Sequence, residues 1–131
     1  MTVLRRHLYW KKQADKDLRK AERDFTEGDY EWACFTSQQA AEKIVKATLY
    51  SFGKEARGHL ITNLLKELSV HIPVSEDLIE CAKKLDFHYI PTRYPNAFSR
   101  GAPFDFYTIS MAQEAIENAK KIFVFCEKIF V

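Results

Sequence analysis

The sequence predicts an all-α protein, an up-and-down bundle of about five helices in a single domain that spans residues 1–131. Three observations support this prediction. Apolar residues recur at spacings of three and four along five segments, which is the period of an amphipathic helix. The four glycines and four prolines fall between these segments. A chain of 131 residues can form one full hydrophobic core, and helices bury their apolar stripes by packing against one another.

The first two helices are predicted over residues 7–26 and 30–52. The first carries one apolar stripe, formed by Trp10, Ala14, Leu18, Ala21 and Phe25. Gly28 ends it, and Asp29 is a candidate N-cap for the second helix. The second helix is long and rich in small residues, which permit close approach of neighbouring helices. We therefore expect it at the centre of the bundle, with Gly53 at its C-terminal end.

Three more helices are predicted over residues 59–70, 76–87 and 108–130. Ser75 and Thr108 are candidate N-caps for the last two. In the final helix, Val124 and Phe125 lie partly off the main apolar stripe. Apolar residues on a second face indicate a surface for self-association, so we expect these two side chains in a dimer interface.

Composition and charge narrow the class of protein. The 47% hydrophobic and 29% charged residues are ordinary for a soluble globular chain, and no apolar run approaches the ~20 residues of a membrane span. No apolar segment follows Arg5 and Arg6, so we expect no signal peptide and a cytoplasmic location. The net charge is only +2, but residues 1–24 hold eight basic and four acidic residues. That excess is typical of a solvated helix face, and a phosphate-binding face is the alternative.

The cysteines do not form a recognisable site. Cys34, Cys81 and Cys126 are far apart in the sequence, and no pair has CxxC spacing. A structural metal site needs clustered Cys and His residues, so the sequence predicts three buried free thiols, no metal and no cofactor.

The stretch between the last two helices is the candidate functional segment. Residues 89–103 contain three of the four prolines and are rich in Tyr and Arg, unlike a flexible linker. We expect Arg93 to bind a phosphate of a nucleotide or RNA, with Tyr89 or Tyr94 stacking on a base. His88 and Arg100 are further candidates. In the alternative, Arg93 pairs with a helix carboxylate or bonds helix-end carbonyls, and both tyrosines pack on the bundle.

Three groups of residues resemble the HEPN (higher eukaryotes and prokaryotes nucleotide-binding) domain family. The opening helix contributes Trp10, Ala14, Asp17 and Leu18. The second helix contributes Ala-Cys-Phe-Thr-Ser-Gln-Gln-Ala-Ala-Glu-Lys at positions 33–43. The third group is Tyr-Ile-Pro-Thr-Arg-Tyr-Pro at positions 89–95. The resemblance covers nearly the whole chain.

This resemblance implies a dimeric helical bundle from a prokaryote. It also implies a partner, a minimal nucleotidyltransferase, with which such proteins form a toxin–antitoxin-like pair. Gln39 and Lys43 are candidates to line the dimer cleft. Many family members are metal-independent ribonucleases in which an Arg is followed, after four to six residues, by a His.

The sequence departs from that ribonuclease motif. The allowed positions after Arg93 hold Phe98, Ser99 and Arg100, none of which is a general base near neutral pH. We therefore assign no catalytic residue and expect a module that binds nucleotide or RNA, or docks a nucleotidyltransferase. One alternative is an RNA endonuclease with an atypical site that uses Arg93 with His88 or Arg100. The other is a purely structural dimer.

Overall fold

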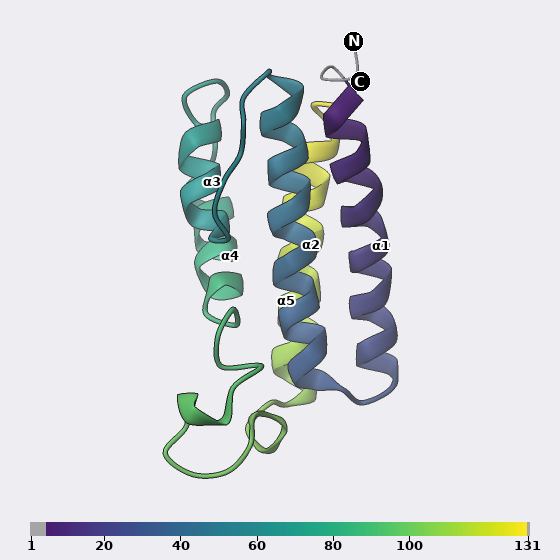
Figure 1. The fold of residues 1–131 in the computed structure, drawn as a ribbon, viewed down its shortest axis with the longest axis vertical. Helices are drawn as coiled ribbons and strands as arrows, with labels where there is room; N and C mark the ends of the chain where they lie inside the picture. The colour runs from purple at the N-terminus through teal and green to yellow at the C-terminus, as the bar shows by residue number, and fades with distance from the viewer. Residues whose placement is uncertain (1–4, 131) are drawn as a thin grey trace.

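The computed structural model describes residues 5–130, and it confirms the predicted all-α fold. Its helices are α1 (Arg6–Thr26), α2 (Tyr30–Ser51), α3 (Ile61–Leu68), α4 (Glu76–Asp86) and α5 (Ile109–Glu127). Two short 3-10 turns, Pro95–Ala97 and Pro103–Asp105, lie between α4 and α5, and no strand occurs within residues 5–130. Figure 1 shows three long helices side by side, with the shorter α3 and α4 stacked along one edge.

The core is organised around α2. This helix packs against α1, α3, α4 and α5, and fourteen of its residues are buried. Buried alanines on α2 remove bulk where the neighbouring helices cross, so the backbones approach closely. The small residues that predicted a central position are Ala33, Cys34, Ala40, Ala41 and Ala47, all fully buried.

Two of the three predicted helix caps are confirmed. The Ser75 hydroxyl accepts a hydrogen bond from the Leu78 amide at 3.2 Å, and the Thr108 hydroxyl accepts one from the Met111 amide at 3.2 Å. The prediction for Asp29 is wrong, because its side chain makes no capping bond. Its backbone has φ −87° and ψ 71°, outside the extended conformation that usually aims an N-cap side chain at the following amides.

The predicted third helix is shorter than the apolar pattern indicated. The pattern covered residues 59–70, whereas α3 spans Ile61–Leu68 and leaves His59 in the connector. Leu60, at the N-cap position, has no side chain that could cap the helix. Its first amides instead donate hydrogen bonds to a carboxylate that is distant in the sequence. The period of the apolar residues does not predict such a contact.

The segment between α4 and α5 is held by local contacts. Phe98 and Phe106 stack with ring centroids 4.5 Å apart. Gly101 has φ +84°, and a Cβ atom there would lie 3.0 Å from the Phe106 ring. A residue with a side chain would thus be strained in backbone and in packing. The segment is folded against itself and lies below α4 and α5 in Figure 1.

Two further expectations concern the state of the cysteines and the presence of membrane-spanning helices. Cys34, Cys81 and Cys126 are buried free thiols, as predicted. Within residues 5–130, no helix combines the length and the apolar character needed to cross a bilayer.

Candidate functional site

A stripe of buried polar residues runs along α2. Gln38, Glu42 and Lys46 are spaced by four and therefore share one helix face. They are 0%, 3% and 5% exposed. Lys and Glu are rarely buried unless they are paired, so this stripe requires specific partners. We call it the polar stripe of α2.

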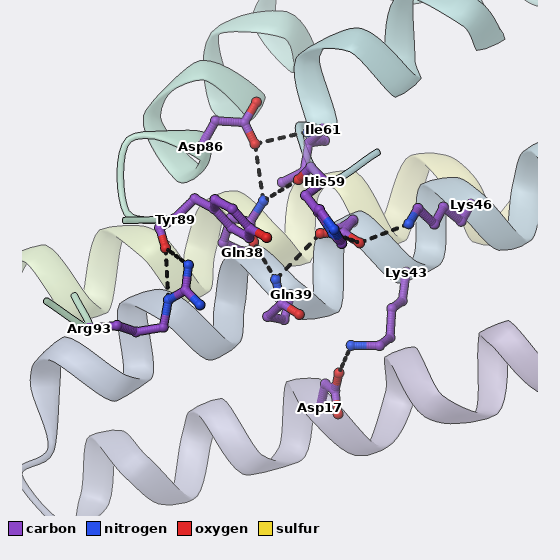
Figure 2. Close-up of polar contacts among 11 residues, drawn as sticks. Asp17, Gln38, Gln39, Lys43, Lys46, His59, Ile61, Asp86, Tyr89 and Arg93 are labelled. Carbon is purple, nitrogen blue, oxygen red and sulfur yellow. Dashed lines mark hydrogen bonds and ion pairs between the residues drawn. The ribbon is translucent and has the colours of Figure 1, made fainter. Parts of the chain in front are cut away.

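Gln38 joins α2 to the connector before α3 and to the end of α4. Its Nε2 donates to the His59 carbonyl at 2.8 Å and to Asp86 Oδ1 at 3.2 Å. Its Oε1 accepts from Gln39 Nε2 at 2.9 Å. Asp86 in turn accepts from the Ile61 amide at 2.9 Å. These bonds place the residue 59–61 backbone directly over the polar stripe (Figure 2).

The Glu42 carboxylate is the centre of the charged part of the stripe. Its Oε2 lies 3.0 Å from Lys46 Nζ and 3.3 Å from His59 Nδ1. Gln39 Nε2 lies 3.4 Å from the other oxygen. Lys46 also lies over the Trp10 ring, 5.2 Å from its centroid. The buried negative charge is therefore compensated by a buried cation and by further donors.

Arg93 lies beside this network in a cage of aromatic rings. Its guanidinium carbon is 4.5 Å from the centroid of Phe35, 4.7 Å from that of Tyr89 and 5.0 Å from that of Tyr94. Both Nε and one terminal nitrogen donate to the Tyr89 carbonyl. The carbonyl contact anticipated in the alternative interpretation of Arg93 is thus present. Cation–π contacts of this kind orient the guanidinium while leaving its charge in place.

Tyr89 connects Arg93 to the polar stripe. Its ring stacks on the His59 ring with centroids 5.4 Å apart and an interplanar angle of 16°. In Figure 2 the Tyr89 ring lies between Arg93 and His59. The aromatic ring, the imidazole and the guanidinium therefore form a continuous row along this side of the molecule.

A pocket of about 210 Å³ opens next to the arginine cage, between α1 and α2. Phe35 belongs to both. The pocket combines aromatic rings, hydrogen-bonding side chains and charged groups, and its lining residues are Asp17, Lys20, Trp32, Phe35, Thr36, Gln39 and Lys43. Lys43 Nζ pairs with Asp17 Oδ2 at 2.7 Å (Figure 2). The pocket thus includes Gln39 and Lys43, the two residues expected at a dimer cleft.

His88 faces a different part of the molecule from Arg93. Its Nδ1 lies 3.3 Å from the Tyr107 hydroxyl, and burial lowers the pKa of the imidazole, partly opposed by the charge of Glu114. It lines a cavity of about 390 Å³ between α4 and α5. The other lining residues are Lys83, Lys84, Phe87, Met111 and Glu114. Of the candidate ligand-binding residues, the structure therefore groups Tyr89, Arg93 and Tyr94, while Arg100 is exposed in the loop between the two 3-10 turns.

The comparison with known proteins identifies the family. The HEPN domain family matches residues 7–129. This chain belongs to the HEPN family. The match extends over all five helices of the structure, so the resemblance that the sequence motifs indicated is confirmed.

Solved structures agree with this assignment. TT1696 from Thermus thermophilus is 45% identical, with a TM-score of 0.92 over 95% of this chain and 98% of that one. ST0689, an archaeal HEPN homologue, is 41% identical, with a TM-score of 0.80 over 94% and 96% of the two chains. Among curated proteins, "Putative toxin MJ1304" of Methanocaldococcus jannaschii is 28% identical over 120 residues, 85% of this chain and 79% of that protein.

The C-terminal helix of this HEPN domain presents part of the apolar surface expected from its sequence. Val124 is 55% exposed. Phe125 is half-buried and packs against the core. Shallow depressions flank Val124 on the side of α1 and on the side of α4. Val124 therefore contributes exposed surface, whereas Phe125 also packs against the core and contributes to folding.

Sequence reasoning missed several residues of the site, namely Gln38, Glu42, Lys46, His59 and Asp86. The spacing of Gln38, Glu42 and Lys46 places them on one helix face, but the sequence does not show that this face is covered. Its partners are 17 to 48 residues away in the sequence. Among residues 5–130, no three Asp, Glu, His or Cys side chains lie where they could share a metal ion.

Proposed function

We propose that this HEPN domain binds a nucleotide or a segment of RNA in the pocket beside Arg93, and that it acts in a toxin–antitoxin-related pair. The observation that carries the proposal is the combination of an aromatic pocket with an adjacent caged arginine. Phe35 is common to both, because it lines the pocket and lies 4.5 Å under the Arg93 guanidinium.

The pocket has the chemistry of a nucleobase site. Trp32 and Phe35 are in edge-to-face contact, 6.1 Å between centroids, and Trp32 is exposed at the surface. Unpaired bases bind to proteins by stacking on such rings and by hydrogen bonds at their edges. Thr36 and Gln39 supply donors and acceptors at the pocket wall. The volume of about 210 Å³ is too small for a long segment and limits the occupant to a small group.

Basic groups around the pocket are suited to bind the phosphates of a nucleotide or of RNA. Lys20 and Lys43 line it, and each is paired with an aspartate, Asp24 at 2.9 Å and Asp17 at 2.7 Å. A phosphate would compete for these ammonium groups. Arg93 has a guanidinium donor beyond the two nitrogens bonded to the Tyr89 carbonyl. A planar fork of donors is well suited to phosphate oxygens.

The role in a toxin–antitoxin-related pair is proposed from the similarity to known proteins. A relative from Methanocaldococcus jannaschii bears the name "Putative toxin", and the family resemblance implies a minimal nucleotidyltransferase as partner. We propose the same arrangement for this chain, as a cytoplasmic homodimer that meets its partner through residues 88–107. The exposed Val124 supports a self-association surface on α5.

Tryptophan fluorescence tests the binding site. The chain has two tryptophans, so a Trp10→Phe background leaves Trp32 as the only reporter at the pocket. Addition of a mixed-sequence oligoribonucleotide is expected to quench this signal because a base stacks on the ring. Arg93→Ala should weaken binding about tenfold or more, as expected for a lost charge-assisted contact. Arg6→Ala, which removes an exposed arginine at the far end of α1, is the matched control.

Two results would oppose the proposal. Absence of quenching by RNA or by mononucleotides would show that the pocket does not take a base. Equal losses of RNA affinity in Arg93→Ala and Arg6→Ala would show that the overall charge attracts the RNA and that no specific site binds it.

A further inference from the structure

We infer that the pocket beside Arg93 selects nucleobases that carry an exocyclic amino group, and that Gln39 is the residue that recognises this group. The inference rests on the nucleotide or RNA binding proposed above and adds a base preference to it. Its basis is a chain of hydrogen bonds that runs from Asp86 through Gln38 to Gln39. Adenine and cytosine carry an amino group at the position where hypoxanthine and uracil carry a carbonyl oxygen.

The direction of the Gln38 side-chain amide is fixed by two acceptors. Gln38 is fully buried, and its Nε2 lies 2.8 Å from the His59 carbonyl oxygen and 3.2 Å from Asp86 Oδ1. Asp86 also accepts the backbone amides of Ile61 and Thr62, so its carboxylate is occupied as an acceptor. The reverse orientation of the amide would place Gln38 Oε1 against two oxygens. Gln38 Oε1 therefore points away from them.

The orientation of Gln38 determines that of Gln39. Gln39 Nε2 donates to Gln38 Oε1 at 2.9 Å, and it lies 3.4 Å from Glu42 Oε1. Figure 2 shows the Gln39 nitrogen turned toward Gln38 and the Gln39 oxygen turned away from it. Since an amide nitrogen has two protons, both donors of Gln39 are directed into the polar stripe. Its Oε1, an acceptor, is the atom that remains for the pocket.

The donors and acceptors that Thr36 brings to the pocket wall are also not equally available. Its hydroxyl has one proton and donates it to Asp24 Oδ2 at 3.1 Å, so only lone pairs remain for a ligand. Thr36 and Gln39 are three positions apart on α2 and are therefore neighbours on one helix face. The α2 wall of the pocket thus offers two acceptors, while the ammonium groups of Lys20 and Lys43 are paired with aspartates.

Two neighbouring acceptors match an amino group. The amino group of cytosine or adenine has two protons and can bridge both oxygens. Uracil has a single N–H between two carbonyl oxygens, and hypoxanthine has a carbonyl where adenine has the amino group. Those carbonyl oxygens would face the oxygens of Gln39 and Thr36, and polar atoms left without a partner weaken binding. The pocket therefore discriminates mainly by rejecting the carbonyl bases.

The preference is tested with oligoribonucleotides that differ only in their bases. Oligocytidylate and oligouridylate of equal length have the same charge and backbone. Trp32 fluorescence in the Trp10→Phe protein should show that oligocytidylate binds about five- to tenfold more tightly, as expected for one hydrogen bond gained or lost. A second pair, oligouridylate carrying one adenosine or one inosine, has the same ring size at the variable position. The adenosine form should bind more tightly by a similar factor.

Variants identify the residue that recognises the base. Gln39→Met removes the acceptor at a similar side-chain length, so the ratio of the two dissociation constants should fall to about one. Gln113→Met is the matched control, because Gln113 is an exposed glutamine of α5, and the ratio should stay unchanged. Thermal unfolding of each variant confirms that it is folded.

Gln38 is a positioning residue, and its variant tests the chain of hydrogen bonds. In Gln38→Met the Gln39 amide loses the oxygen that holds its nitrogen, so it can turn and present either atom to the pocket. The ratio of the two dissociation constants should therefore fall although Gln39 is still present. A merely structural role of Gln38 would weaken binding of both oligomers equally and leave the ratio unchanged.

The outcomes distinguish this inference from the proposed function. Equal binding of both oligomers, or tighter binding of oligouridylate, overturns the base preference and leaves the binding function standing. A preference that persists in Gln39→Met or in Gln38→Met also overturns the inference. A preference in both ligand pairs that is lost in these two variants and kept in Gln113→Met supports it. Absence of binding by every oligomer contradicts the proposed function itself.

Discussion

The carboxylate of Asp86, at the C-terminal end of α4, caps the N-terminus of α3 by accepting the Ile61 amide at 2.9 Å. Its second oxygen accepts the amide and the hydroxyl of Thr62, at 2.9 and 2.8 Å. A residue 25 positions away in the sequence thus performs the role that an N-cap side chain usually plays. Because Gln38 donates to the same carboxylate, this cap also holds the connector that carries His59.

Asp86→Ala is expected to destabilise the protein by about 2 kcal/mol. Loss of an N-cap costs ~0.5–2 kcal/mol, and the substitution also leaves Gln38 and Thr62 without this acceptor. Urea unfolding measures the change. Asp105→Ala, which removes an exposed carboxylate bonded to the Ala102 amide, should cost less than about 1 kcal/mol. Equal effects of the two substitutions would refute a special role for Asp86.

The buried thiols predict a loss of stability in alkali. Burial raises the pKa of Cys34 and of Cys126 from 9.0 to about 12. Between these values the unfolded chain loses thiol protons that the folded chain keeps, so the free energy of unfolding falls as the pH rises. Denaturant titrations across this range should show the fall. Cys126→Ala should make the free energy of unfolding fall less steeply with pH. A dependence on pH equal to that of the wild type would show that the buried Cys126 thiol is not the cause.

His88 predicts a loss of stability in acid. Burial lowers its pKa below the ordinary 6.5, so below pH 6.5 the unfolded chain binds a proton that the folded chain disfavours. The free energy of unfolding should therefore fall as the pH is lowered through this region. NMR titration should place the His88 ring signal below pH 6.5. In His88→Gln the corresponding part of the pH dependence should disappear.

Val124→Asp tests the proposed homodimer. Val124 is exposed on α5, so a charge there should disrupt an apolar interface without opening the core. Light scattering should show a dimer for the wild-type protein and half that mass for the variant. Val70→Asp is the control, because Val70 is also exposed but follows α3. A monomeric wild-type protein would disprove the predicted dimer. Phe125→Ser is less informative because Phe125 packs against the core.

Most of the fold was predictable because its determinants are local. The apolar period, Ser75 and Thr108 each act within a few residues, and the helices they predicted are present. Errors occurred where a local signal was incomplete. Asp29 was expected to cap α2 but has a backbone conformation that does not aim its side chain. The start of α3 moved by two residues from the predicted position, because its cap comes from Asp86.

The candidate site was predictable only in part. The Pro, Tyr and Arg content of residues 89–103 drew attention to Arg93, and the two tyrosines named with it lie in its aromatic cage. The third ring, Phe35, comes from α2. His88 was grouped with Arg93 because they are near in sequence, but its side-chain contact is with Tyr107.

The sequence by itself determined the class of fold, the central position of α2 and the segment around Arg93. These depend on periodicity, residue size and backbone preference, which act over short stretches of chain. Only the tertiary structure decided that one face of α2 is covered, and that Glu42 meets His59 across 17 residues of sequence. A buried carboxylate takes whichever donors packing brings within reach, and that choice depends on how the helices are arranged.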